Sequence, residues 1–200
     1  MFNLRKSDKE KDFWNWFVKN KSEIEKFIDS DFSDYSIYNQ LTRKLKPYSS
    51  ILFPELTKNE NDEYVLIITP DGDEKGIEPT KKLFDKHPKM ENWLVRKYRQ
   101  PCDEIGLNFD GVEYPSRDIE IIPEFEDKDK VDLRIFVRNL NKDEKRYRSL
   151  AYLYLDHILG EFNSITKIRY VDFYHLDDGK SVKGGIGLLE LRKLIEEKLY

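Results

Sequence analysis

The sequence predicts an α+β fold in which two β-β-α-β repeats form mainly antiparallel sheet, with helices before the first repeat and after the second. Two observations predict it. An apolar strand, a polar turn and a second apolar strand occur twice, at residues 51–69 and 121–137. Each pair is followed by a segment with helical periodicity and then by one more strand. Hairpins mixed with helices are typical of helices packed on largely antiparallel sheet.

The two strand pairs align residue by residue with one constant offset. The aligned pairs are Pro54 with Pro123, Glu55 with Glu124, Tyr64 with Leu133, Leu66 with Ile135, and Ile68 with Val137. The equal spacing favours an internal duplication. The alternative is a chance match, because alternating strands with Pro and Glu near one end resemble one another.

Two helices are expected before the first repeat, within residues 1–47. The pattern Ser7-x-x-Glu10 is a capping box, and it precedes apolar residues at helical spacing, with a possible break at residues 20–22. Asp34 is expected to cap the second helix, which ends before Pro47.

The repeats themselves have predicted boundaries. The first repeat, residues 51–99, is expected to hold strands at 51–56, 63–69 and 93–99, a turn at Asp71-Gly72 and a helix at 78–86. The second, residues 118–175, is expected to hold strands at 119–125, 131–138 and 165–174 and a helix at 143–159. The helix at 143–159 has the clearest apolar periodicity in the chain, and Gly160 stands where a helix commonly ends in glycine.

The remaining segments are connections and a final helix. Residues 100–117 link the repeats, and Asp110-Gly111 between alternating apolar residues predicts a hairpin there. A polar, glycine-rich loop at 176–187 leads into a C-terminal helix at 188–199. We expect one domain over residues 1–200.

Composition narrows the classes of function. The chain is 38% hydrophobic and 37% charged, which predicts a thin core beneath a strongly hydrated surface. Its net charge is −4 with both signs intermixed, so nucleic acid is not an expected partner. The single cysteine, Cys102, excludes an internal disulfide and a cysteine-rich zinc site. No apolar stretch is long enough to span a membrane, and no signal sequence is seen, which favours a cytoplasmic protein.

Two glycine-containing loops resemble anion sites. Gly179-Lys180-Ser181 matches the end of a phosphate-binding loop, but Tyr174 stands where that motif needs glycine, so we expect a surface loop. Residues 184–187, Gly-Gly-Ile-Gly, open the last helix, whose free N–H groups could hold an anion. The alternative, which we favour, is a turn that lets this helix pack.

A group of carboxylates and imidazoles lies in the second repeat. Its members are Asp156, His157, Glu161, Asp172 and His175. Such residues on two adjacent elements can bind a metal or transfer protons. Their spacing matches no metal-binding motif, and the helical phase points Asp156 outward, so a solvated boundary is the favoured interpretation. We predict no metal and no cofactor. This group supports an alternative function, an enzyme of unrecognised type.

Two further features are candidates for chemistry. Cys102 follows Pro101 in a loop, and a thiol nucleophile needs a base; His87 is the nearest histidine in sequence, and nothing positions it. We expect an ordinary, half-buried cysteine. A basic cluster opens the helix at 143–159 and comprises Lys142, Lys145, Arg146, Tyr147 and Arg148. It could contact phosphates, but a charged solvent face is expected.

Three segments carry a resemblance. They are Phe13-Trp14-Asn15-Trp16-Phe17-Val18, then Asp71-Gly72 with Asn92-Trp93, then Leu155-Asp156-His157-Ile158-Leu159-Gly160-Glu161 with Asp172-Phe173. With them most of the chain resembles a family of uncharacterised bacterial proteins, a domain of unknown function. The resemblance implies a bacterial source, and it implies no activity and no catalytic residues.

The favoured function is a binding or interaction module without catalytic activity, with an unknown protein as partner. In the predicted strand at 93–99, the charges of Arg96, Lys97 and Arg99 fall on both faces, so one face should meet solvent. Tyr and Arg are enriched in interface cores. We therefore predict that Arg96 and Tyr98 form part of an exposed contact surface. The alternative places Tyr98 in the core and pairs Arg96 with a carboxylate.

Overall fold

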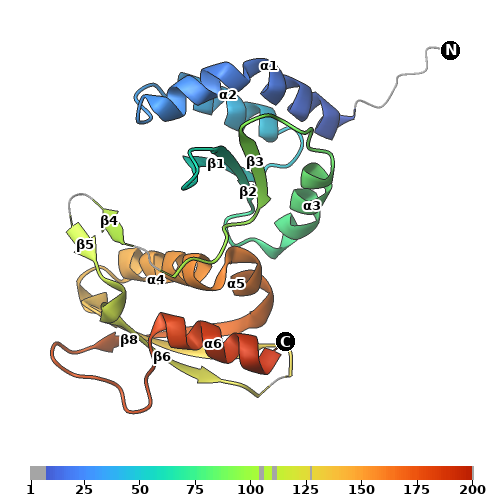
Figure 1. Ribbon diagram of the computed structural model, residues 1–200. Coiled ribbons are helices and arrows are strands. Elements are labelled where there is room, and N and C mark those ends of the chain that lie inside the picture. Colours follow the sequence, from blue (N-terminus) through green and yellow to red (C-terminus); the bar gives the residue numbers. More distant parts are fainter. Residues whose placement is uncertain (1–7, 104–105, 110–111, 127, 200) are drawn as a thin grey trace. The chain divides into compact units, whose positions relative to one another are not determined.

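The computed structural model describes residues 8–103, 106–109, 112–126 and 128–199, and its helices and strands confirm the α+β class (Figure 1). The chain divides into two compact units, residues 1–99 and 100–200. The expectation of one domain over residues 1–200 stays a prediction. Each unit has its own cluster of buried apolar side chains, so each can be described by itself.

The first unit begins with the long helix α1 (Lys9–Asp29). Asp8 caps it, because its carboxylate accepts a hydrogen bond from the Lys11 backbone N–H at 3.1 Å. Ser7, the predicted cap, lies outside the described residues. The helix continues through residues 20–22 without the expected break, and the Asn20 side chain donates a hydrogen bond to the carbonyl one turn earlier. A single helix therefore spans the whole apolar pattern.

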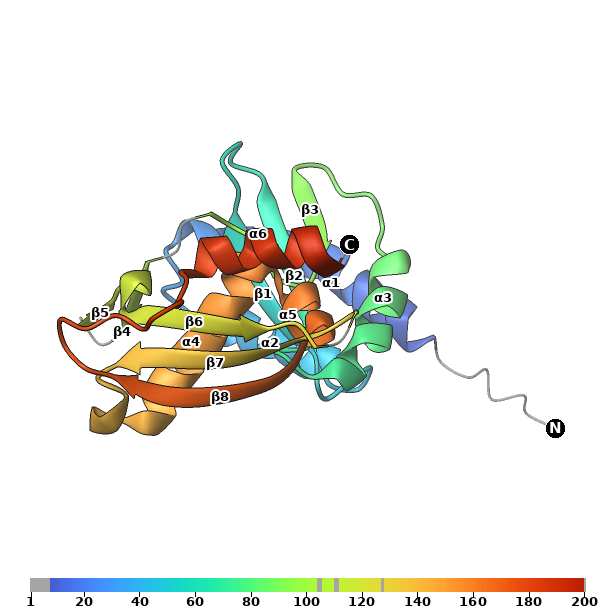
Figure 2. The same cartoon turned by 90° about the horizontal axis from the view of Figure 1, so that it is seen from below.

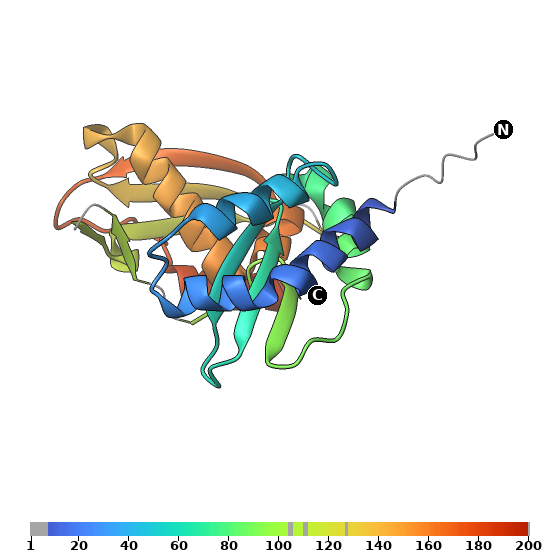
Figure 3. The ribbon, with the colours of Figure 1, turned by 90° about the horizontal axis from the view of Figure 1, so that it is seen from above.

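A three-stranded sheet and two more helices complete the first unit. These elements are α2 (Ser36–Leu45), β1 (Phe53–Lys58), β2 (Tyr64–Thr69), the short 3₁₀ turn η1 (Glu74–Gly76), α3 (Ile77–Asp85) and β3 (Trp93–Lys97). The strand order is β1-β2-β3, with β1 antiparallel and β3 parallel to β2. Figure 3 shows α1 and α2 lying across one face of these strands.

The core of this unit joins the sheet to all three helices. Leu66 and Ile68 of β2 are fully buried in the same apolar cluster as side chains from α1, α2 and α3. The indole N–H of Trp14 donates a hydrogen bond to the Leu83 carbonyl at 2.8 Å, which fixes α1 against α3. Large buried rings thus find polar partners for their N–H groups, as buried tryptophan requires.

Within its described residues, the second unit contains two sheets and three helices. Its elements are β4 (Leu107–Phe109), β5 (Val112–Tyr114), η2 (Ser116–Asp118), β6 (Ile119–Glu124), β7 (Val131–Arg138), η3 (Leu140–Lys142), α4 (Glu144–Leu159), α5 (Glu161–Lys167), β8 (Ile168–Leu176) and α6 (Leu188–Leu199). β4 and β5 form the predicted antiparallel hairpin, while its turn, Asp110-Gly111, lies outside the described residues.

The larger sheet has the order β6-β7-β8, with β6 antiparallel and β8 parallel to β7. Side chains along β7 alternate between buried and half-buried, so one face of the sheet is core and the other meets solvent. The inner face packs with α4 and α6. As predicted, α4 buries Ala151, Tyr154, Leu155 and Ile158, although Leu150 is only half-buried.

Helix α5 was not predicted, because residues 165–167 were assigned to the start of a strand. Asn163 donates a side-chain hydrogen bond to the Leu159 carbonyl at 3.0 Å, and the Thr166 hydroxyl donates one to the Phe162 carbonyl at 2.7 Å. These bonds return to the preceding turn and favour helix in a segment whose β-branched residues suggest strand. β8 therefore begins later and reaches Leu176.

The two larger sheets share a topology: an antiparallel hairpin, a helical crossover and a parallel third strand. The residue-by-residue alignment predicted from the sequence, however, does not match the pairing register of the two hairpins. Pro54 pairs with Ile68, but Val137, which the alignment equates with Ile68, pairs with Ile119 and not with Pro123. The two prolines therefore occupy different positions in their hairpins. A common origin of the two units stays a prediction.

Candidate functional site

Arg96 and Tyr98, the predicted contact residues, have different surroundings in the first unit. Tyr98 follows the end of β3, and its φ of +62° takes it out of the alternation of the strand. Its ring is 5% exposed, and its hydroxyl donates a hydrogen bond to the Ile77 carbonyl at 3.1 Å. The expectation of an exposed Tyr98 is wrong for this reason. Arg96 is half-buried, and its role in contact stays a prediction.

Arg99 is buried, although its charge had suggested a solvent-facing strand. Its Nη2 atom lies 2.6 Å from Oε1 of Glu55 and 2.8 Å from Oδ1 of Asp71. Its Nε atom also donates to Glu55, at 2.8 Å. The Arg99 guanidinium thus links β1 to the turn after β2 through two ion pairs, so its charge has a structural role.

The carboxylates and histidines of the second repeat do not form one cluster. Asp156 is buried in α4, contrary to the outward position predicted, because the buried arc of this helix runs without a gap from Tyr154 to Asp156. Asp172 and His175 lie on opposite faces of β8, since their partners on β7 are Arg134 and Val137. Among the residues described, no three His, Cys, Asp or Glu side chains gather as a metal site would require.

Cys102 is half-buried in the second unit. Burial raises the pKa of its thiol, although the nearby Arg192 charge acts in the opposite direction. The Cys102 backbone N–H donates a hydrogen bond to the His157 carbonyl at 2.8 Å. The histidine whose backbone contacts Cys102 is therefore His157, whereas His87 is the histidine nearest to Cys102 in sequence. A raised pKa means less thiolate at neutral pH.

The glycine-rich loops have structural partners. Lys180 forms an ion pair with Asp177 at 2.7 Å, and Arg138 donates hydrogen bonds to the carbonyls of both residues. Glu120 accepts a hydrogen bond from the Val182 N–H at 2.6 Å. A Cβ on Gly185 would lie 2.9 Å from that carboxylate and 3.1 Å from the Val182 carbonyl oxygen, so this part of the loop is closely packed. These contacts support the packing role for the loop.

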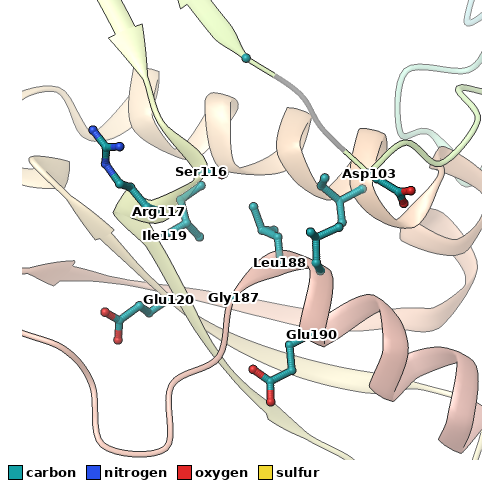
Figure 4. Close-up of a pocket in the computed structure, with 11 residues that line it drawn as sticks. Asp103, Ser116, Arg117, Ile119, Glu120, Gly187, Leu188 and Glu190 are labelled. Carbon is teal, nitrogen blue, oxygen red and sulfur yellow. The ribbon is translucent and has the colours of Figure 1, made fainter.

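A hollow of about 700 Å³ lies where α6 begins. Its described lining residues are Asp103, Gly106, Ser116, Arg117, Ile119, Glu120, Ile158, Gly187, Leu188, Leu189 and Glu190. Figure 4 shows Leu188 near its middle, while the charged ends of Arg117, Glu120 and Glu190 point apart from one another. Carboxylates outnumber cations in this lining, which opposes anion binding at the start of the helix.

The basic cluster at the start of α4 is engaged within the second unit. Arg148 pairs with Glu144 at 2.5 Å, and its guanidinium lies 5.1 Å from the ring centre of Phe173. The Arg146 guanidinium lies 5.3 Å from the ring centre of Tyr114. Cations over aromatic faces gain a favourable electrostatic interaction. Two members of the cluster therefore stabilise the fold.

Exposed aromatic rings gather along β8, the edge strand of the larger sheet. Tyr170 is 67% exposed and Tyr174 is 42% exposed on its outer face, while Tyr152 of α4 is 46% exposed and contacts Phe173 on the inner side. We define the β8 edge surface as Tyr152, Tyr170, Phe173 and Tyr174 together with the open backbone edge of β8. Figure 2 shows the outer face of β6, β7 and β8 in front, with α4 behind it.

The rings on the outer face are held in place by their neighbours. Tyr174 stacks on Phe136 of β7, with ring centres 5.0 Å apart and planes inclined by 22°. Arg169 binds both carboxylate oxygens of Asp132, at 2.8 and 2.5 Å, and its guanidinium lies over the ring of Tyr170. The hydrogen bond from Arg169 lowers the pKa of Asp132 below its usual value. Both tyrosines are thus supported from within the sheet.

The other edges of the two three-stranded sheets carry features that oppose pairing with another strand. β1 contains Pro54, and the short β3 carries Arg96 and Lys97. β6 contains Pro123 and is bridged at Ile121 by residue 186. Proline, charge and coverage are the usual means of protecting an edge. β8 is the longest strand described in either unit and contains neither proline nor glycine, and its charged residues Arg169 and Asp172 leave the segment from Phe173 to Leu176 without a carboxylate or a guanidinium.

The sequence contains a signal for this surface. Tyr170 and Tyr174 are four positions apart, which places them on one face of a strand, and polar Asp172 lies between them on that same face. A face of this kind is not core. The sequence does not give the position of the strand in the sheet. An edge strand and a central strand differ in the number of neighbouring strands, and their amino-acid composition can be the same.

Comparison with protein-family models, with curated proteins and with solved structures found no match to this chain. The resemblance to an uncharacterised bacterial family therefore stays a prediction. Within the described residues, each helix is too short or too polar to cross a membrane.

Proposed function

We propose that this protein is a protein-binding module that uses the β8 edge surface for contact. The observation that carries the proposal is the gathering of exposed rings, Tyr152, Tyr170 and Tyr174, on both sides of one edge strand. Tyrosine is among the residue types enriched in interfaces. An edge strand adds a row of backbone N–H and C=O groups that can pair with a strand of the partner.

Preorganisation supports the same proposal. Ordering a flexible side chain on binding costs free energy, so a ring already held by its neighbours contributes more affinity. Tyr174 is stacked on Phe136, and Tyr170 lies beneath the Arg169 guanidinium. Their exposed surfaces can therefore be buried against a partner with little further loss of side-chain freedom.

Affinity capture from the source cells tests this proposal. We expect the tagged full chain to retain a partner identifiable by mass spectrometry, and the double variant Tyr170→Ser, Tyr174→Ser to lose it by about tenfold, because hot-spot rings carry much of the binding energy. The control is Tyr35→Ser, which removes an exposed ring from the first unit.

The same capture distinguishes the surface around Arg96. If Arg96→Ala abolishes capture while the tyrosine double variant retains it, the contact surface lies on β3 and the proposal for β8 is wrong. Loss of capture in the Tyr35→Ser control would also contradict it. Thermal melts of every variant check that the fold is intact.

A further inference from the structure

We propose that the partner strand at the β8 edge surface is β8 of a second copy, paired antiparallel about a two-fold axis at Phe173. The inference rests on the proposed function and names its partner. Pairing of this kind joins two β6-β7-β8 sheets into one continuous sheet, and every contact occurs twice by symmetry.

A bulge in β8 sets the length that can pair. Val131 pairs with Ile168 and Asp132 with Tyr170, so Arg169 is an extra residue that interrupts the ladder. From Tyr170 to Leu176 the register is regular. Phe173 is the midpoint of this regular segment, and an axis there uses the whole of it. An axis nearer the start of β8 would bring the bulge into the paired region.

Charge selects the same register. With the axis at Phe173, Asp172 lies opposite Tyr174 of the second copy, where the phenol can donate a hydrogen bond to the carboxylate. With the axis at Asp172 the two Asp172 carboxylates would oppose each other, and like charges directly opposite one another destabilise a strand pair. Asp172 is exposed, so the residue that lies opposite it in a second copy affects the stability of the strand pair.

The inner side of the strand contributes an apolar contact. Phe173 of each copy meets its equivalent at the axis, flanked by the Tyr152 rings, whose centres lie 5.4 Å from those of Phe173. Aromatic pairs across strands stabilise a sheet. The rings exposed in the single chain are therefore the ones that this arrangement covers.

Sedimentation equilibrium of the full chain, with a charge exchange, tests the register. Wild type should show twice the mass of one chain. Tyr174→Asp places a carboxylate opposite Asp172 at two symmetric positions and should weaken the dimer by about tenfold. Adding Asp172→Lys to that variant turns both contacts into opposite-charge pairs and should restore the dimer. Tyr35→Asp, the same change at an exposed ring elsewhere, should leave the mass unchanged.

A single-chain mass for wild type at all concentrations, or a double variant that stays dissociated while its thermal melt is unchanged, would overturn the inference. A dimer that Tyr174→Asp leaves intact would overturn it as well. If wild type is monomeric but the tyrosine double variant still loses its captured partner, the second copy is excluded and the binding function stands. If the dimer forms as described but nothing else is captured, self-association is the whole of the binding.

Discussion

Leu155 lies on the inner side of α4 and has no exposed surface. It belongs to the apolar cluster that joins α4 and α6 to the β6-β7-β8 sheet. A side chain in this position contributes through the area it removes from water and through close contact with its neighbours, and both are lost when it is shortened.

Leu155→Ala is expected to lower the free energy of unfolding by about 2–5 kcal/mol, as large-to-small changes in a core do. Chemical denaturation monitored by circular dichroism measures it. The matched control is Leu189→Ala, because Leu189 is 45% exposed and its truncation should cost well under 1 kcal/mol. Equal losses in both variants would show that Leu155 is not a core residue.

Tyr98 and Arg99 show where residue-level inference from the sequence reaches its limit. Alternation assigns faces correctly only while the backbone stays extended, and the left-handed φ of Tyr98 ends that pattern. Arg99 then turns to Glu55 and Asp71, which are distant in sequence. Nothing in residues 93–99 predicts those partners, because they are set by tertiary structure.

At the scale of elements, the entry into α3 depends on a close backbone approach. Gly76 ends η1 and precedes α3, and a Cβ built on it would lie 2.3 Å from Cβ of Pro70. Real carbon atoms do not approach so closely, so a side chain here must displace the turn after β2. Asp71, which pairs with Arg99, lies in that turn.

Gly76→Ala should therefore destabilise the protein by about 1–3 kcal/mol, the usual cost of overpacking. Thermal or urea unfolding measures the loss. Gly106→Ala serves as the control, because a Cβ there has no neighbour within 4 Å among the described residues. A Gly76→Ala variant as stable as wild type would mean that the turn has another arrangement available.

Periodicity predicted most of the elements because it reports burial along one segment. The helix at 143–159 and the hairpins at 51–69 and 119–138 follow from it. It did not predict α5, where side-chain hydrogen bonds to the backbone decide the conformation. It also could not give strand register, which depends on the length and path of each turn, or identify β8 as an edge.

At the scale of the whole molecule, the chain forms two compact units divided after Arg99. Each has a three-stranded sheet, helices on its inner face and a separate apolar cluster. A unit with its own core contains the main source of its stability, the burial of apolar surface. The division therefore predicts independent folding.

Residues 1–99 and residues 100–200, each expressed alone, are expected to give folded spectra and cooperative thermal melts. A fragment ending at residue 92 should be unfolded, because it lacks β3 and the Arg99 ion pairs. Circular dichroism and calorimetry check both results. Unfolded spectra for the two complete units would show that each needs the other.

The bridge between Ile121 and Ile186 has a consequence for assembly. Residue 186 exchanges two backbone hydrogen bonds with Ile121, both of 2.9 Å, and so occupies the edge of β6, where Pro123 already removes a donor. A sheet with two open edges can grow without limit into a fibril. In this sheet residue 186 occupies the β6 edge, so the pairing proposed at β8 would close after two chains and would leave no template for a third.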